Sequence, residues 1–181
     1  QTNAPVQPKT EPEKETKNLQ SAPTVTVNID NPIVEKAIRK QIKKPTGELT
    51  EADLEKVAVL DLRYNELTDV SPLAGLTQLK ELNLEETQLT DKQLNHLVGL
   101  TKLETLWLLN NNLTDLSALA GLTQLTYLNV NDNELTDVSA LVGLKQLKLL
   151  DLQGNPDLTK AQIDQLQKAL PKCRIGSNPT K

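Results

Sequence analysis

The sequence contains almost no aromatic residues: one Trp, two Tyr and no Phe among 181 residues. A hydrophobic core must therefore be built from aliphatic side chains, and leucine is the commonest of these along the chain. Cysteine is equally scarce, because Cys173 is alone. A single cysteine excludes an intramolecular disulfide and leaves the redox compartment open.

Long hydrophobic runs and an excess of basic residues are also absent. The longest apolar runs, such as Val57–Leu60, are far shorter than the roughly 18 residues that a membrane span requires. The formal net charge of −4 argues against a nucleic-acid partner, because phosphate binding needs clustered Lys and Arg. The chain begins at Gln1 without Met, which indicates a processed exported product or a trimmed chain.

No spacing typical of catalysis or of cofactor binding is present. The sequence has no phosphate loop, dinucleotide fingerprint or metal-ligand spacing, so we expect no cofactor and no metal. His96 is the only histidine, and no motif pairs it with a nucleophile, so it is predicted to be a surface residue. The sequence does not support an enzymatic function.

The two ends of the chain differ from its middle. Residues 1–23 contain four prolines and alternating Glu and Lys with almost no large apolar side chain, which predicts a disordered linker. Residues 24–56 predict an N-terminal cap, made of a short strand with alternating apolar residues and two helices. Asn31 and Pro32 are typical of the start of the first helix, which we expect Pro45 and Gly47 to end; Thr50 caps the second.

Internal repetition is the strongest signal in the sequence. Five segments that show the pattern L-x-L-x-x-N-x-L, with modest departures, begin at residues 60, 82, 106, 128 and 150. This pattern resembles the leucine-rich repeat family. The resemblance implies an α/β solenoid with a concave parallel β-sheet and convex 3₁₀ or α segments, because no unit can bury its leucines alone. We assign residues 57–158 to five repeats, 159–176 to a C-terminal helical cap and 177–181 to a disordered tail.

Two polar columns recur once per repeat. In the family, the asparagine after each strand joins a ladder of hydrogen bonds to the backbone; the matching residues are Asn65, Asn111, Asn133 and Asn155. The second unit is two residues longer, has Thr87 at this position and predicts a weaker rung and a fuller α-turn. The second column is acidic and is expected to cap the helical segments rather than bind calcium: Asp69, Asp91, Asp115 and Asp137.

The only tryptophan lies between two leucines that the repeat places inside. Leu106 and Leu108 occupy inward positions, so Trp107 and Leu109 are expected on the concave face, near Tyr127. A central apolar cluster with a polar rim is the usual arrangement of a binding hot spot. The predicted rim consists of Asp61, Arg63, Tyr64, Asn83, Glu85, Asn129, Asn131 and Asp132. Because six carboxylates face outward against Arg63 alone, we expect a protein or peptide partner with a basic rim.

Within the family, the helical cap and the "LTDVSPLAGLTQL" units look most like bacterial internalin-like proteins. This resemblance implies a monomeric, non-enzymatic binding module, secreted or held at the cell envelope, with a lipid-modified cysteine upstream of Gln1 as one form of anchor. The 22-residue units are also similar to those of cytosolic phosphatase-regulator proteins, so an intracellular regulatory subunit is the alternative. A structural role through self-association of the concave face is a third hypothesis. The buried C-terminal cap is expected to enclose Cys173.

Overall fold

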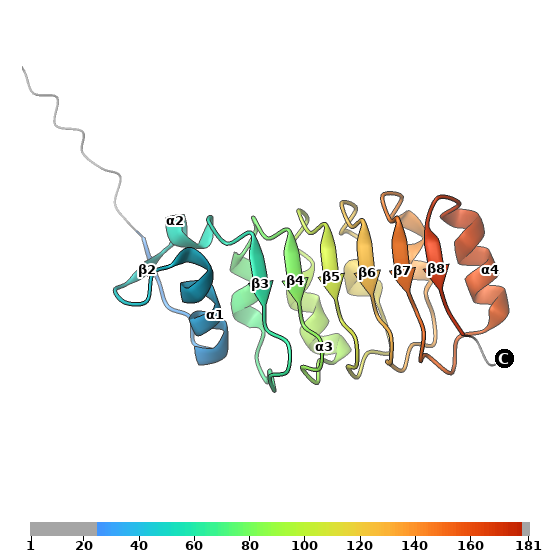
Figure 1. Cartoon of the computed structure of the whole chain (residues 1–181), viewed down its shortest axis with the longest axis horizontal. Coiled ribbons are helices and arrows are strands. Elements are labelled where there is room, and N and C mark those ends of the chain that lie inside the picture. The colour runs from blue at the N-terminus through green and yellow to red at the C-terminus, as the bar shows by residue number, and fades with distance from the viewer. Residues whose placement is uncertain (1–24, 179–181) are drawn as a thin grey trace, which may run out of the picture.

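The repeats form one continuous parallel sheet. The computed structural model describes residues 25–178; the predicted linker 1–23 and residues 179–181 of the predicted tail lie outside the described residues. The strands follow one another in chain order, each paired in parallel with the next: β3 (Val59–Asp61), β4 (Glu81–Asn83), β5 (Thr105–Trp107), β6 (Tyr127–Asn129), β7 (Leu149–Asp151) and β8 (Arg174–Gly176). They lie side by side between an N-terminal and a C-terminal cap (Figure 1).

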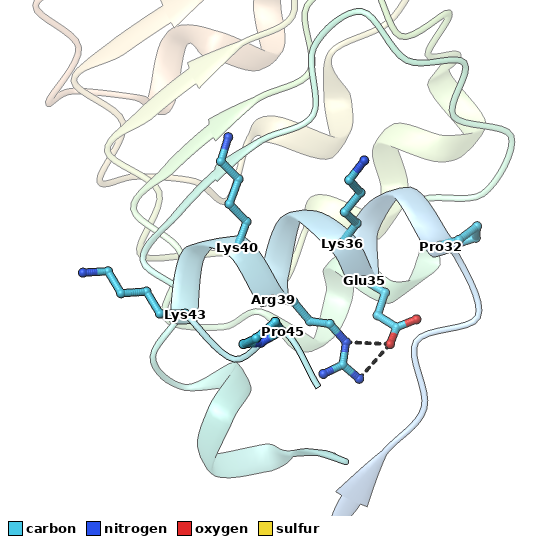
Figure 2. A pocket seen from close by; sticks show the side chains of 7 residues that line it. All are labelled: Pro32, Glu35, Lys36, Arg39, Lys40, Lys43 and Pro45. Carbon is cyan, nitrogen blue, oxygen red and sulfur yellow. Dashed lines mark hydrogen bonds and ion pairs between the residues drawn. The ribbon is translucent and has the colours of Figure 1, made fainter. Parts of the chain in front are cut away.

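The N-terminal cap is built on helix α1 (Pro32–Ile42). Asn31 begins this helix as predicted, because its side-chain oxygen accepts hydrogen bonds from the backbone N–H groups of Ile33 and Val34. Val34 and Ile38 are fully buried, whereas the opposite face of the helix carries basic residues (Figure 2). The helix ends before Pro45 because Lys43 adopts a left-handed conformation, with φ of 56°. The helix thus ends just ahead of Pro45 and Gly47, which the sequence predicts to stop it, and Lys43 is the residue that turns the chain.

Two short strands and a short helix complete this cap. β1 (Thr26–Val27) pairs antiparallel with β2 (Leu49–Thr50), and α2 (Glu51–Leu54) follows directly. The Thr50 hydroxyl oxygen caps α2 by accepting a hydrogen bond from the N–H of Asp53, and the Asp53 carboxylate accepts one from the backbone N–H of Thr50. Asp53 is only 6% exposed, and ammonium groups approach its carboxylate at 2.6 Å from Lys44 and 3.0 Å from Lys56. These lysines lower the pKa of Asp53 far below its usual range.

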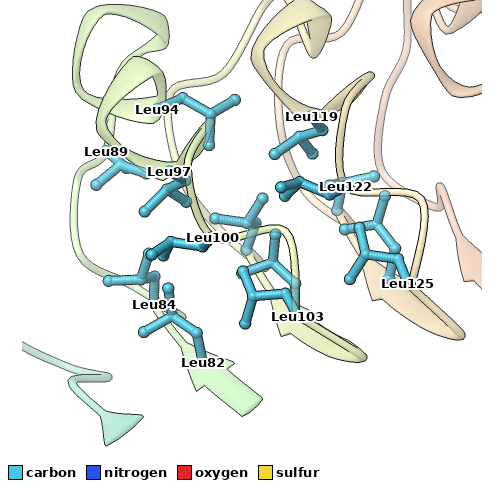
Figure 3. Close-up of a cluster of buried hydrophobic side chains, with 14 of the residues drawn as sticks. Leu82, Leu84, Leu89, Leu94, Leu97, Leu100, Leu103, Leu119, Leu122 and Leu125 are labelled. Carbon is cyan, nitrogen blue, oxygen red and sulfur yellow. The ribbon is translucent and has the colours of Figure 1, made fainter. Parts of the chain in front are cut away.

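The hydrophobic core runs the whole length of the solenoid. The central residue of each strand is in register with the next, from Leu60 through Leu82 to Leu150 and then Ile175. Every leucine or valine of the L-x-L pairs is at most 2% exposed. Leucines of the strands and of the returning segments meet inside, as around Leu82 and Leu97 (Figure 3). The predicted α/β solenoid is therefore confirmed.

The segments that return from one strand to the next are mostly short 3₁₀ turns. They are η1 (Ser71–Gly75), η3 (Ser117–Leu119) and η4 (Ser139–Gly143). The longer second unit instead forms α3 (Asp91–Leu94) followed by η2 (Asn95–Leu97), the fuller turn that its extra residues predict. Thr90 and Gln93 form a capping box at the start of α3, and Leu94 and Leu97 are fully buried beneath it.

The C-terminal cap contributes a helix and an additional strand. Helix α4 (Lys160–Ala169) begins with a capping box between Thr159 and Gln162. The short extension after it forms β8, a strand that the repeat pattern does not predict, and the N–H of Leu152 donates to Gly176 O at 2.7 Å. Beyond β8, the side-chain oxygen of Asn178 accepts a hydrogen bond from the N–H of Gly154 at 2.9 Å. The first part of the predicted tail thus contacts the last repeat.

Candidate functional site: the concave face

The outward-pointing residues of the strands form regular columns across the concave face. The first column is Val59, Glu81, Thr105, Tyr127, Leu149 and Arg174; the second is Asp61, Asn83, Trp107, Asn129, Asp151 and Gly176. In the five repeats this is the register that the sequence predicts. β8 extends the first column by one cation.

Trp107 and Tyr127 form an aromatic pair in the middle of this face. Their ring centroids are 5.6 Å apart and their planes are tilted by 53°. Tyr127 lies on the neighbouring strand, where its register partner is Thr105. Trp107, Tyr127 and Leu109 are all half-buried rather than fully exposed. The pair therefore presents a pre-organised apolar surface, held by ring contact of a kind worth about 0.5–1.5 kcal/mol.

Most polar residues of the second column are engaged by the backbone. The side-chain oxygens of Asp61, Asn83 and Asn129 each accept a hydrogen bond from the N–H two residues further on, at 3.3, 2.9 and 2.9 Å. Such local bonds stabilise the turn after each strand. Asn131, also a predicted rim residue, accepts from the N–H of Gln153 at 2.7 Å. Trp107 occupies the same column and, unlike these residues, has no side-chain oxygen to hold a turn.

The N-terminal part of the face is held by contacts among its own side chains. Arg63 pairs with Asp61 at 3.2 Å, and its guanidinium lies 5.8 Å from the ring centre of Tyr64. The hydroxyl of Tyr64 donates to Glu85 at 3.3 Å, and the Glu85 charge raises the pKa of Tyr64. Tyr64 nevertheless remains 62% exposed. These four predicted rim residues form one connected group.

The residue that opens each turn has a left-handed backbone. Its φ is between 52° and 70° in all five units: Tyr64, Glu86, Asn110, Asp132 and Gly154. Asn and Asp tolerate this conformation best among residues with a side chain. Asp132, the last predicted rim residue, is exposed here, and a Cβ on Gly154 would lie 1.9 Å from its carboxylate oxygen.

Cations reduce the acidity that the sequence predicts for this face. Arg63 is the one cation in the predicted balance, and it is neutralised by Asp61. Arg174 of β8 joins the first column beside Leu149 and adds a positive charge that the repeat pattern alone did not reveal. At the edge of the sheet, Lys80 pairs with Glu104 at 2.9 Å. Three of the remaining carboxylates, Glu81, Glu85 and Glu86, lie on β4 and in the turn after it, beside the strand of Trp107, whereas Asp132 and Asp151 lie after β6 and on β7.

The asparagine ladder joins successive units beneath the sheet. The side-chain N–H₂ of Asn133 donates to Leu108 O of the preceding unit and to Val130 O of its own, at 3.0 and 3.1 Å. Its oxygen accepts from the N–H of Leu113 at 3.1 Å. Asn111 and Asn155 make equivalent bonds. Asn133, Asn111 and Asn155 are buried, so their amides satisfy backbone groups that water does not reach.

The ladder is weaker at its first two positions. Asn65 is half-buried and donates only within its own unit, to Leu62 O and Arg63 O at 2.9 Å. The hydroxyl of Thr87 bonds Leu84 O at 2.8 Å and Asn111 but does not reach the preceding unit. In the preceding unit, the N–H of Leu67 donates to the backbone oxygen of Thr87 at 3.3 Å rather than to a side-chain amide.

Three of the four recurring aspartates hold the convex turns. Asp69, Asp115 and Asp137 accept from the N–H of the serine two residues later, at 2.8, 2.9 and 3.0 Å. Asp91 does not cap its own helix, contrary to the prediction, because Thr90 already does so. Its carboxylate accepts from the N–H groups of Thr114 and Asp115 in the next unit. Partial burial acts to raise the pKa of Asp91, but the bonds from Thr114 and Asp115 lower it overall.

The described residues contain neither a grouped set of metal ligands nor a membrane-spanning helix. Between residues 25 and 178, no three or more His, Cys, Asp or Glu side chains are grouped to hold a metal ion. Over the same residues, no helix is both long and apolar enough to cross a membrane. His96 is half-buried on the convex side. Hydrogen bonds from Ser71 lower the pKa of Asp69, and the nearby His96 adds to this effect. Cys173 is 4% exposed, as expected, and burial raises the pKa of its thiol.

The sequence matches the family described as "Leucine Rich repeats (2 copies)" over residues 55–97, 101–143 and 123–168. The chain belongs to the leucine-rich repeat family. Its domain is accordingly a protein–protein interaction module. A search of curated proteins found no match.

Solved structures place this leucine-rich repeat chain among bacterial internalin-like proteins. An internalin of Listeria monocytogenes is 26% identical, with a TM-score of 0.71 over 82% of this chain and 43% of that one. A leucine-rich repeat protein of Leptospira interrogans is 30% identical, with a TM-score of 0.62 over 68% of this chain and 32% of the other. Internalin C2 of L. monocytogenes shares the fold, with 24% identity, a TM-score of 0.58 and coverage of 83% and 86%. The chain thus spans less than half the length of the first two.

Proposed function

We propose that the concave face binds a protein or peptide, with Trp107, Leu109 and Tyr127 as its central contacts. The observation that carries this proposal is the position of Trp107. In the second column, β3, β4, β6 and β7 have Asp or Asn, and three of these four side chains hold the following turn. At the same position, β5 has Trp107, which cannot accept such a hydrogen bond and whose half-buried ring instead packs on Tyr127.

The surroundings of this pair define the chemistry of the partner. Glu81 on β4 and Glu85 in the turn after it lie on one side of Trp107, whereas Tyr127 lies on β6, on the other. An apolar side chain of the partner would cover Trp107 and Leu109, and an adjacent Lys or Arg would meet the β4 carboxylates. Aromatic anchors carry much of the affinity at such interfaces, and charges at the rim mainly set specificity and association rate.

The rest of the predicted rim is assigned to support rather than to specificity. Asn83, Asn129 and Asn131 hold turns, and Asp61, Arg63 and Tyr64 are engaged with one another or with Glu85.

Similarity to Listeria internalins favours an exported or surface-held bacterial protein over an intracellular regulator. We propose that it acts there as a monomer. Fractionation of the source cells tests the location, and light scattering across a range of concentrations tests the monomer.

Selection from a random peptide display library tests the proposed binding face. Peptides selected on the unmodified protein should lose about thirtyfold or more in affinity for Trp107→Ala, because a central aromatic contact is worth about 2 kcal/mol or more. Val142→Ala is the matched control, since Val142 is 37% exposed and belongs to η4 on the convex side. Binders that lose affinity for Val142→Ala but not for Trp107→Ala would refute the assignment.

A further inference from the structure

A second surface lies on the outer side of helix α1, away from the repeats. A groove of about 620 Å³ follows this side of the helix; it is lined by Pro32, Glu35, Lys36, Arg39, Lys40, Lys43 and Pro45. We call it the α1 stripe (Figure 2). Four of its seven residues are cationic and only Glu35 is acidic. None of them belongs to the concave face or to the asparagine ladder.

Three lysines of the α1 stripe have unpaired ammonium groups. Arg39 is held by Glu35 at 2.8 Å. Lys36, Lys40 and Lys43 are exposed, and within residues 25–178 no hydrogen bond or ion pair engages their ammonium groups. Along the helix axis they are separated by about 6 Å and about 4.5 Å. They therefore form a short line of cations that are free to bind an anionic partner.

The basic character of this region contrasts with the repeats. Residues 31–47 contain five Lys or Arg and one Glu, whereas residues 48–158 contain seven Lys or Arg and eighteen Asp or Glu. The repeats would be repelled by an anionic surface, and the N-terminal cap would be attracted. Figure 1 shows α1 at one end of the elongated solenoid, beyond β3. Contact there leaves the concave face open.

We propose that the α1 stripe docks this end of the protein on a bilayer with anionic headgroups. Lys36 and Lys40 on α1 and Lys43 at its C-cap are unpaired, and each lysine near an anionic bilayer surface contributes about 1 kcal/mol of attraction. The apolar face of α1 is buried in the core, where Val34 and Ile38 are fully covered, so the helix does not insert. Docking is therefore electrostatic, shallow and weakened by salt.

Co-sedimentation with vesicles tests this proposal on the full chain. The probes are phosphatidylcholine vesicles with and without one third phosphatidylglycerol, at low and at high salt. We expect binding only to the anionic vesicles, at millimolar lipid and low salt. The variant Lys36→Gln/Lys40→Gln/Lys43→Gln should lose roughly fivefold per lysine and thus roughly a hundredfold in all.

A matched triple variant separates position from overall charge. Lys148→Gln/Lys168→Gln/Lys172→Gln removes the same three charges from exposed positions in the C-terminal part of the solenoid and should retain most of the binding. Equal losses in both triple variants would overturn the α1 assignment, and so would the absence of binding to anionic vesicles. Binding to a soluble polyanion such as polyphosphate without binding to vesicles would overturn the bilayer as the partner. Circular dichroism melting confirms that both variants fold.

Discussion

Replacement of one ladder asparagine should reveal how much the ladder contributes to stability. In Asn133→Ala, the N–H of Leu113 loses its partner inside the protein. An orphaned buried donor costs about 1–3 kcal/mol. The carbonyl oxygens of Leu108 and Val130 lose one bond each but keep a second, from Asn111 and Asn155 respectively. The loss of these two hydrogen bonds adds about 1 kcal/mol, so the free energy of unfolding should fall by about 2–4 kcal/mol in all.

Asn65→Ala is the matched control because the same residue type is removed from the same position of the first repeat. Asn65 is half-buried, donates only to Leu62 O and Arg63 O, and accepts no backbone N–H. Its loss should cost about 1 kcal/mol, since water can reach the exposed side of this turn.

Urea unfolding measures both changes. The midpoint of Asn133→Ala should fall by about 1–2 M, and that of Asn65→Ala by less than half as much. Amide hydrogen exchange provides a local reading, because the N–H of Leu113 should lose its protection only in the Asn133 variant. Equal costs for the two variants, or an unchanged Leu113 amide, would refute the assignment of the stabilisation to bonds between units.

Three further perturbations address the core, the cap and a turn. Leu108→Ala should cost about 2–5 kcal/mol in urea unfolding because Leu108 is fully buried, whereas Trp107→Ala should cost less than about 1.5 kcal/mol. Folding lowers the pKa of Asp53. The stability that the Asp53 carboxylate contributes is therefore present above the ordinary carboxyl pKa of about 3.9 and is lost as the pH falls below that value. The melting temperature of the unmodified protein should accordingly fall more steeply between pH 6 and pH 3 than that of Asp53→Asn. Gly154→Ala should destabilise by about 1–3 kcal/mol because its φ is 70° and the new Cβ would collide with Asp132, and Asp132→Ala should restore part of that loss in the double variant.

The repeated parts of the fold could be predicted because each residue class recurs in register. Leu106 and Leu108 could be placed inside, and Trp107 outside, since a strand alternates its faces and the neighbouring units fix which face is buried. The start of α1 at Asn31 was equally readable, because an N-cap uses only local chemistry.

The features that could not be predicted depend on contacts between units or on a single conformation. β8 has no L-x-L pattern, and Ile175 joins the sheet only because Leu150 offers it an edge. Asp91 has the same sequence position as the other recurring aspartates, but Thr90 takes its capping role and leaves its carboxylate for the next unit. Lys43 ends α1 through a left-handed backbone that its residue type does not favour.

Most polar residues on and beneath the concave face are engaged in hydrogen bonds, which leaves few side chains free for the proposed contact with a partner. The buried asparagines satisfy the backbone inside, and Asn83 and Asn129 satisfy the turns outside, so substitution of either group would disturb the scaffold. Trp107 and Tyr127 satisfy no backbone group with their side chains in the described structure, and their removal leaves the L-x-L core intact. The proposed binding residues can therefore change without a loss of the fold, because stability comes from the inward leucines and the engaged asparagines, whereas the two aromatic side chains point outward.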